Sequence, residues 1–298
     1  MIIKKLKNIN INEKNLVFAG LAKNCLSSLQ KNLDFISKFS AELPGYNLRF
    51  IVVESDSTDG TKEYLEQINL EFLEIITADN LDKQFKYRTE KIANCRNMIL
   101  DKLKKEQSNI DFIYIPIDLD IEIFEYQDIH DFHLQLNHFI ENQIYDAYFP
   151  FSFPYYYDIH ALRSKGWNSH NPWERVKKIN KYIFIGKFFA RYFYVYRIQK
   201  KYSIKRELIN VESAFGGIGF YKLNNSLLEI VNYEIEIDLG NNSCEHLKFN
   251  SFFKNKAIIP KWKIPSPKEH IEYKILNFKE KNLYVLTSIM NDLKSLIS

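Results

Sequence analysis

Over the first 120 residues, short apolar runs alternate with longer stretches in which apolar residues recur every three or four positions. The short runs have the length of buried strands, and they lie at 15–20, 50–53, 72–76 and 112–117. The amphipathic stretches predict helices over about 25–40, from about 62, and over about 87–105. Strands that alternate with helices at this spacing indicate a mostly parallel sheet covered by helices on both faces, so we predict an α/β fold.

The pattern changes after about residue 145. Residues 147–158 are aromatic and strand-like, and the segment 167–206 is both basic and aromatic. Because no low-complexity linker or internal repeat separates the two parts, we interpret the chain as one continuous domain. Its first half would span about 15–145 and its second half about 146–260. The last fifty residues carry no pattern from which we assign a role.

The composition fits a packed globular protein, with 46% hydrophobic and 15% aromatic residues. The cysteines Cys25, Cys95 and Cys244 are too few and too scattered for a disulfide framework. Residues 1–8 lack the apolar core of a signal peptide, and no stretch approaches eighteen consecutive apolar residues. We therefore expect a cytoplasmic protein without a transmembrane helix.

An acidic triplet, Asp118-Leu119-Asp120, directly follows the apolar run 112–117. In a strand, residues i and i+2 point the same way, so the two carboxylates can converge on one point. Paired carboxylates suit Mg²⁺ or Mn²⁺, and proteins often share such an ion with a substrate phosphate. Many surface turns carry the same triplet by chance, so its weight depends on the residues around it.

A polar run, 54–61, follows the second strand, and ligands of parallel sheets bind beyond the carboxyl ends of the strands. We expect Glu54 to accept hydrogen bonds from a base or a ribose, with Ser55 and Asp56 beside it. Ala19, near the end of the first strand, would lie at the same edge. The alternative is that 54–61 is only a turn and a helix cap.

The helix before the triplet carries a third cluster. Arg88, Ile92 and Arg96 follow one another at four-residue steps and therefore share one face. Guanidinium groups suit a diphosphate, and Asn97 could reach a sugar or ribose hydroxyl. The alternative is a solvated helix with two surface arginines.

Taken in order, these clusters and two later motifs resemble the GT-A fold of nucleotide-sugar glycosyltransferases, and within it the cryptococcal capsule mannosyltransferase family. The later motifs are Phe215-Gly-Gly-Ile-Gly-Phe-Tyr221 and Cys244-Glu-His-x-x-Phe249-Asn250. A Tyr-Asp-Arg signature over 155–163 is similar as well. The resemblance covers residues 15 to about 250. It implies a nucleotide-sugar-binding first half, an acceptor-side second half, and transfer of a hexose from a GDP- or UDP-sugar to a glycan or lipid-linked glycan in surface polysaccharide or lipopolysaccharide synthesis.

The resemblance also implies roles for single residues. Asp118, Asp120 and His246 would hold the Mn²⁺ or Mg²⁺ ion, and Asp118 could contact ribose instead. Two carboxylates, Glu245 and Asp158, remain candidates for the catalytic residue; a retaining enzyme would need no general base. The donor would contact Ala19, Glu54, Ser55, Asp56, Arg88, Arg96, Asn97, Asp118, Gly216 and Gly217.

The segment 167–206 holds eleven Lys or Arg residues against a single acidic one, Glu174. Basic charge with interfacial aromatic residues suits anionic lipid headgroups, so this segment is a candidate for peripheral binding to the inner face of a membrane. No nucleic-acid-binding module is visible. A nucleotidyltransferase remains an alternative, although 19–24 is poor in the glycine that its phosphate loop would need. A non-catalytic membrane-binding protein on a degenerate transferase fold is another.

Overall fold

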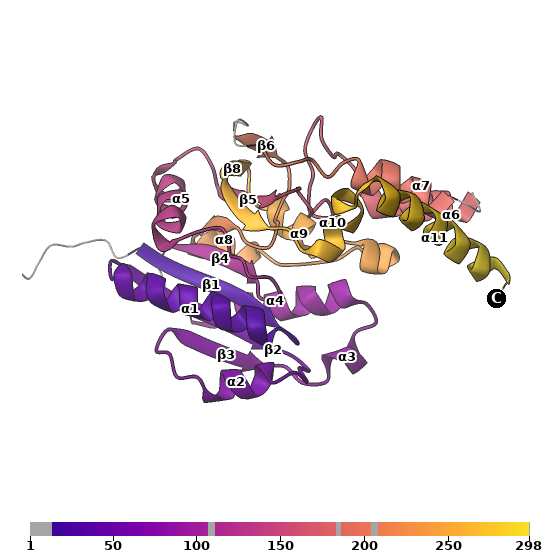
Figure 1. The fold of residues 1–298 in the computed structure, drawn as a ribbon. Coiled ribbons are helices and arrows are strands. Elements are labelled where there is room, and N and C mark those ends of the chain that lie inside the picture. Colours follow the sequence, from indigo (N-terminus) through magenta and orange to yellow (C-terminus); the bar gives the residue numbers. More distant parts are fainter. Residues whose placement is uncertain (1–13, 107–110, 183–185, 204–207, 298) are drawn as a thin grey trace, which may run out of the picture.

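Our computed structural model describes residues 14–106, 111–182, 186–203 and 208–297. In these ranges, eight strands form one mixed sheet in the order β3-β2-β1-β4-β7-β5-β8-β6 (Figure 1). The strands are β1 (Lys14–Ala22), β2 (Tyr46–Glu54), β3 (Leu73–Thr77), β4 (Phe112–Asp118), β5 (Ala147–Phe153), β6 (Ile209–Val211), β7 (Phe220–Leu223) and β8 (Lys256–Pro265).

The N-terminal half of the sheet is parallel throughout, as the alternating pattern predicts. Strand β1 pairs with β2 on one side and with β4 on the other, and β3 extends the sheet beyond β2. The register places Ala22 opposite Glu54 and Leu21 opposite Asp118, so the carboxyl ends of three strands meet at one edge. Beyond β4 the sheet is mixed, because β7 runs antiparallel to both β4 and β5.

Two apolar layers sandwich the sheet, because successive side chains of a strand point to opposite faces. Leu16 and Phe18 of β1 pack against α1, α2 and α5, whereas Val17 and Ala19 pack toward α4, α8 and α9. The predicted α/β class with helices on both faces is therefore confirmed. The helices of these layers and of the adjoining loops are α1 (Leu26–Glu42), α2 (Thr61–Gln67), α3 (Leu81–Gln84), α4 (Arg88–Lys105), α5 (Ile129–Glu141), α8 (Asn225–Ile230), η2 (Ile237–Asn242) and α9 (Glu245–Ser251).

A group of helices extends beyond the sheet and has a small core of its own (Figure 1). We call it the helical extension; it comprises α6 (Pro172–Tyr182), α7 (Gly186–Arg191), η1 (Tyr192–Tyr196), α10 (Lys268–Ile275) and α11 (Phe278–Ile297). Its core joins the basic aromatic segment to the last fifty residues, for example through the rings of Phe188 and Tyr284. Lys205 and Arg206 of the basic segment, and the N-terminal residues 1–13, lie outside the described residues.

None of the helices in the described part of the chain combines the length and the apolar character needed to cross a bilayer.

Candidate functional site

A cavity of about 890 Å³ lies at the edge where the parallel strands end. Residues after β1, β2 and β4, the N-terminal part of α4, the start of α9 and the helical extension all line it. We call it the strand-end pocket. Its position is the one that the parallel sheet predicts for a ligand.

The two carboxylates of the acidic triplet both line this pocket. Asp118 is the last residue of β4, and its N–H donates to the carbonyl of Gly217 at 2.7 Å. Its Oδ1 accepts a hydrogen bond from Nη2 of Arg96 at 2.9 Å. Burial raises the pKa of Asp118 to about 7, although the neighbouring guanidinium opposes that shift. Asp120 is exposed at the pocket surface.

Arg96 is buried, with 3% of its side chain exposed, and it lies between charges and rings. Its guanidinium pairs with Asp118, and its Nε lies 3.5 Å from Oε1 of Glu245. The rings of Phe215 and Tyr233 lie 5.1 and 5.5 Å from the guanidinium carbon. The sequence suggested that Arg96 holds a diphosphate. In the structure its Nη2 donates to Asp118, while its Nε and Nη1 have no hydrogen-bond partner among the described residues, so a contact with a diphosphate stays a prediction.

His246 follows Glu245 on α9 and is also buried against the pocket. Its ring stacks on Phe215 at 3.7 Å between centroids, and neither ring nitrogen has a hydrogen-bond partner within the described residues. Burial and the nearby Arg96 charge lower the pKa of His246 well below its ordinary value, so the imidazole is neutral at neutral pH. Unpaired buried nitrogens are costly, and a bound ligand would satisfy them.

Within the part of the chain that the structure describes, the pocket provides too few protein ligands to hold a divalent ion alone. Its residues fit an ion that is also bound by the phosphates of a substrate. Over the described ranges, no three His, Cys, Asp or Glu side chains form a set that could hold a metal ion. The expected trio of Asp118, Asp120 and His246 is thus not assembled here, and the role of His246 as a ligand stays a prediction. Two carboxylates remain, and Mg²⁺-type ions are commonly held by one or two carboxylates together with substrate phosphates and water.

A basic rim borders the pocket beside the acidic pair. Lys23, after β1, and Arg88 and Lys91, on the first turn of α4, all line the pocket. Asp82 pairs with both lysines, which lower its pKa to about 2. Lys23 and Lys91 were not among the predicted site residues. Lys91 could have been found from its spacing to Arg88, because i and i+3 share a helix face.

The polar run after β2 bonds mostly to itself and to neighbouring loops. Oε1 of Glu54 accepts the N–H of Ser57, and Asp59 accepts the N–H of Thr61, so several side chains of this run stabilise the turn itself. Asp56 has a φ of +54° and accepts the N–H groups of Asn80 and Asp82. Of the three residues of this run that we predicted to contact the donor, Ser55 lines the pocket, whereas Glu54 and Asp56 do not.

Two predicted donor contacts lie away from the pocket lining. Asn97 donates to the carbonyl of Tyr233 and accepts its N–H, both at 2.8 Å, so its amide fastens a loop instead of facing a ligand. Ala19 is 1% exposed in the middle of β1, because the strand continues to Ala22 instead of ending near Gly20. Both expected contacts are therefore corrected.

Gly216 and Gly217 support the site without lining it. Both have positive φ, +82° and +99°, and the N–H of Gly216 donates to Oδ2 of Asp158 at 2.9 Å. A Cβ on Gly217 would lie 2.9 Å from Ile123 and 3.1 Å from the hydroxyl of Tyr157. The glycines thus let this loop approach the ends of β4 and the Asp158 turn, where we had expected them to admit the donor.

The far wall of the pocket comes from residues that were not among the predicted site residues, although some lie in the 155–163 signature and in the basic aromatic segment. The ring of Tyr157 stacks on His270 of α10 at 5.4 Å and 8°. Gln199 is 2% exposed; its Nε2 donates to the carbonyl of His270, and its Oε1 is buried without a partner in the described structure. The remaining wall residues include His160, Trp173, Arg191 and Tyr284. No local pattern could have revealed the contact between Gln199 and His270, because the two residues are 71 positions apart along the chain.

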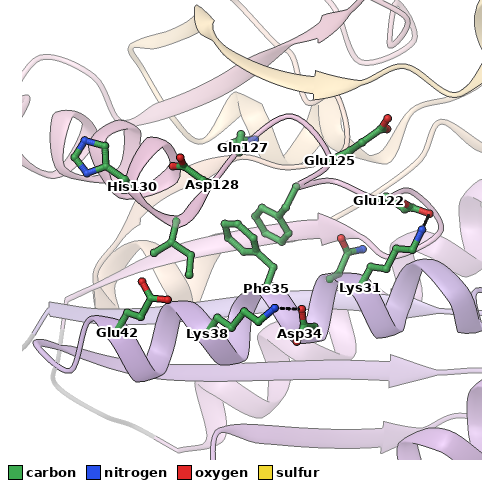
Figure 2. A pocket seen from close by; sticks show the side chains of 13 residues that line it. Lys31, Asp34, Phe35, Lys38, Glu42, Glu122, Glu125, Gln127, Asp128 and His130 are labelled. Carbon is green, nitrogen blue, oxygen red and sulfur yellow. Dashed lines mark hydrogen bonds and ion pairs between the residues drawn. The ribbon is translucent and has the colours of Figure 1, made fainter.

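A second, smaller cavity of about 520 Å³ lies between α1 and the loop that precedes α5 (Figure 2). We call it the α1 groove. Figure 2 shows Lys31 paired with Glu122 and Lys38 paired with Asp34 along its length. The rings of Phe35 and Phe124 stack at 3.9 Å in its floor.

Several solved structures resemble the fold of this chain at low sequence identity. Glucosyl-3-phosphoglycerate synthase from Mycobacterium tuberculosis, in complex with Mn²⁺, UDP and phosphoglyceric acid, is 10% identical over 94% of this chain and 78% of its own, with a TM-score of 0.43. Mannosyl-3-phosphoglycerate synthase from Rubrobacter xylanophilus is 11% identical over 96% and 75%, with a TM-score of 0.43. The mannosyltransferase PcManGT from Pyrobaculum calidifontis, in complex with GDP-Man and Mn²⁺, is 12% identical over 95% and 75%, with a TM-score of 0.42.

No protein-family profile and no curated protein matches the chain. Because the structural likenesses are remote, the function is inferred below from the pocket itself. Membership of the cryptococcal capsule mannosyltransferase family stays a prediction.

Proposed function

We propose that this protein is a metal-dependent glycosyltransferase that moves a sugar from a nucleoside-diphosphate sugar to an acceptor hydroxyl. One observation carries the proposal. The strand-end pocket is lined both by the Asp118 and Asp120 carboxylates and by the basic rim of Lys23, Arg88 and Lys91. Carboxylates for a divalent ion and cations for phosphate oxygens are together the requirements of a metal diphosphate.

In this proposal, Asp118 and Asp120 would hold a Mn²⁺ or Mg²⁺ ion together with the donor's diphosphate. The ion would offset the negative charge that builds on the departing nucleotide. Arg96 keeps the Asp118 carboxylate oriented, and the basic rim binds the phosphates. The nucleoside would lie over the ends of β1 and β2, where Leu21, Val53 and Ser55 line the pocket.

The acceptor would bind against the far wall, between Tyr157 and the helical extension. Its hydroxyl oxygen forms a bond to the anomeric carbon, the bond from that carbon to the phosphate oxygen breaks, and the nucleoside diphosphate leaves. Of the two candidate carboxylates, we assign the acceptor's proton to Glu245. Asp158 already accepts the N–H groups of Ala161 and Gly216, which suits a role in fixing the loop.

We further propose a hexose as the transferred sugar, UDP or GDP as the leaving nucleotide, and a glycan of surface polysaccharide or lipopolysaccharide synthesis as the acceptor. The support for these choices is the ordered set of motifs in the sequence.

The test is thermal unfolding of the purified protein with a panel of nucleoside-diphosphate sugars, with and without Mn²⁺. A ligand that binds the native state raises the midpoint by mass action. We expect a rise with one class of donor that depends on Mn²⁺ and is lost in Asp120→Asn. In a transfer assay, that variant should be at least about a hundredfold slower, because a metal supplies several kcal/mol to the transition state.

The matched control is Glu125→Gln, which removes a charge from the α1 groove. It should keep both the donor-dependent rise and the transfer rate. If no donor raises the midpoint with or without metal, or if Asp120→Asn responds like the unmodified protein, the proposed function is wrong.

A further inference from the structure

The helical extension has an outer surface that the proposed chemistry does not use. Among residues with described side chains, half of the large exposed apolar ones lie on it: Phe189, Tyr192, Phe193, Ile275, Phe278, Leu283, Leu286 and Met290. Single exposed apolar residues are normal on any protein, but their concentration on one group of helices marks an interaction surface.

Helix α11 is two-sided in its described part. Tyr284 and Val285 pack into the small core of the extension. Leu283, Leu286 and Met290 are 65, 59 and 56% exposed, and their spacing of three and four places them on one stripe of the helix. This apolar stripe points away from the core that the helix otherwise helps to build.

The neighbouring α7 and η1 have the same two-sided character. Phe188 and Val195 are buried in the core, whereas Phe189 and Phe193 are each half exposed. Arg191, Val195 and Tyr196, together with Tyr284 of α11, also line the strand-end pocket. The helices that wall the pocket therefore carry the exposed apolar surface as well.

Basic charge accompanies these apolar residues. The segment 167–206 holds eleven Lys or Arg residues against one acidic residue, and Arg197, Lys201 and Lys279 are exposed. Exposed aromatic and aliphatic side chains together with exposed basic residues are complementary to a bilayer with anionic headgroups. A partner protein that matched only the apolar stripe would not account for the excess of basic residues in the segment 167–206.

We propose that the helical extension docks on an anionic phospholipid bilayer. Phe189, Phe193, Leu283, Leu286 and Met290 enter the boundary between headgroups and acyl chains, and the exposed basic residues contact the lipid phosphates. A consequence rests on the proposed function: docking would bring the pocket wall to the membrane surface, where a lipid-linked acceptor presents its hydroxyl.

The experiment is co-sedimentation of the full chain with phosphatidylcholine vesicles, with and without a one-third share of phosphatidylglycerol. We expect binding to the anionic vesicles that weakens with added salt. The double variants Phe189→Ser/Phe193→Ser and Leu283→Ser/Leu286→Ser should each bind about tenfold more weakly. Arg197→Gln/Lys201→Gln should lose a similar factor on anionic vesicles only.

The matched control is Ile144→Ser/Ile230→Ser, which removes two residues that are 65 and 61% exposed elsewhere on the molecule. It should bind vesicles like the unmodified chain. Absence of vesicle binding, or equal loss in this control, would overturn the proposal. So would a dimer in solution that the Phe189/Phe193 variant dissociates, since the surface would then hold a second copy.

Donor-dependent thermal shifts of the same proteins separate the two proposals. A donor shift without vesicle binding would refute the membrane surface and leave the transferase. Vesicle binding without a donor shift would refute the proposed transferase function and leave the membrane surface.

Discussion

The strand-end pocket and the α1 groove are both lined by charged side chains, yet the charges are arranged differently. In the α1 groove the ion pairs, such as Lys31 with Glu122, lie at the surface with more than a third of each side chain exposed. In the strand-end pocket, Arg96 and Glu245 are buried, and neither nitrogen of His246 has a hydrogen-bond partner in the described part of the chain. Water can solvate the charged groups of the α1 groove. The buried polar groups of the strand-end pocket instead lose their solvation, and apolar packing around them does not offset that loss of free energy.

The comparison shows that charge and concavity do not by themselves define a site. The strand-end pocket is distinguished because buried polar groups are left available at the edge where three strands end. Each of the following predictions tests whether that distinction is real.

The largest effect on stability is expected from Arg96→Met. The change leaves two carboxylates, Asp118 and Glu245, near each other without a compensating cation. It should lower the free energy of unfolding by about 3–5 kcal/mol, as breaking a buried ion pair does. Urea denaturation measures this change. A loss below about 1 kcal/mol would mean that the pair resembles those of the α1 groove.

The two candidate catalytic carboxylates should separate into different phenotypes. Glu245→Gln should lower the transfer rate by about 10²–10⁴-fold while the protein still binds donor, because it removes the proton acceptor. Asp158→Asn should instead lower the free energy of unfolding by about 1–3 kcal/mol, because it weakens the bonds from Ala161 and Gly216.

Steady-state rates and urea denaturation of both variants provide the measurement. If Asp158→Asn abolishes transfer at unchanged stability while Glu245→Gln retains it, the two assignments must be exchanged.

His246 should make the fold sensitive to acid. The side chain lies next to Arg96 and Glu245 and near His160, and its pKa is lowered in the folded state. Below about pH 6.5 the unfolded chain therefore binds a proton at this histidine that the folded chain does not bind. The free energy of unfolding should then fall by up to about 1.4 kcal/mol per pH unit from this group.

Urea denaturation over a pH series tests this sign. The slope below about pH 6.5 should be shallower in His246→Gln, and it should be unchanged in His130→Gln, which alters an exposed residue of the α1 groove. An equal slope in the His246 variant would contradict the buried, neutral imidazole.

The smallest effect is expected in the α1 groove. Lys31→Met removes an exposed pair with Glu122, and such pairs contribute less than about 1 kcal/mol because solvent screens them. Urea denaturation should therefore show a change within that limit, and the donor-dependent thermal shift should stay intact. A large loss of donor binding would make the groove part of the site.

Local pattern predicted the parts of the site that are local. Strand periodicity predicted the acidic triplet at the end of β4, and helix periodicity predicted the shared face of Arg88, Ile92 and Arg96. The triplet and all three helix residues line the pocket. Asn97 was assigned wrongly because one residue of a helix turns the side chain by about 100°, from the pocket to the backbone of Tyr233.

The rest depends on contacts between distant segments. The ion pairs of Asp82 with Lys23 and Lys91 need the loop after β1 packed against α3 and α4, and the bond from Gln199 to His270 needs the turn after η1 packed against α10. Arg96 shows the same limit: its position on the helix was predicted, but its burial between two carboxylates is a property of the folded chain.

The central claim is that the acidic pair holds a metal only together with a diphosphate. Its most direct test is a Mn²⁺ titration of the protein, followed by water-proton relaxation, with and without UDP or GDP. We predict weak Mn²⁺ binding alone and binding that one of the nucleotides tightens at least about tenfold. Tight Mn²⁺ binding without nucleotide, or nucleotide binding that ignores Mn²⁺, would contradict the account.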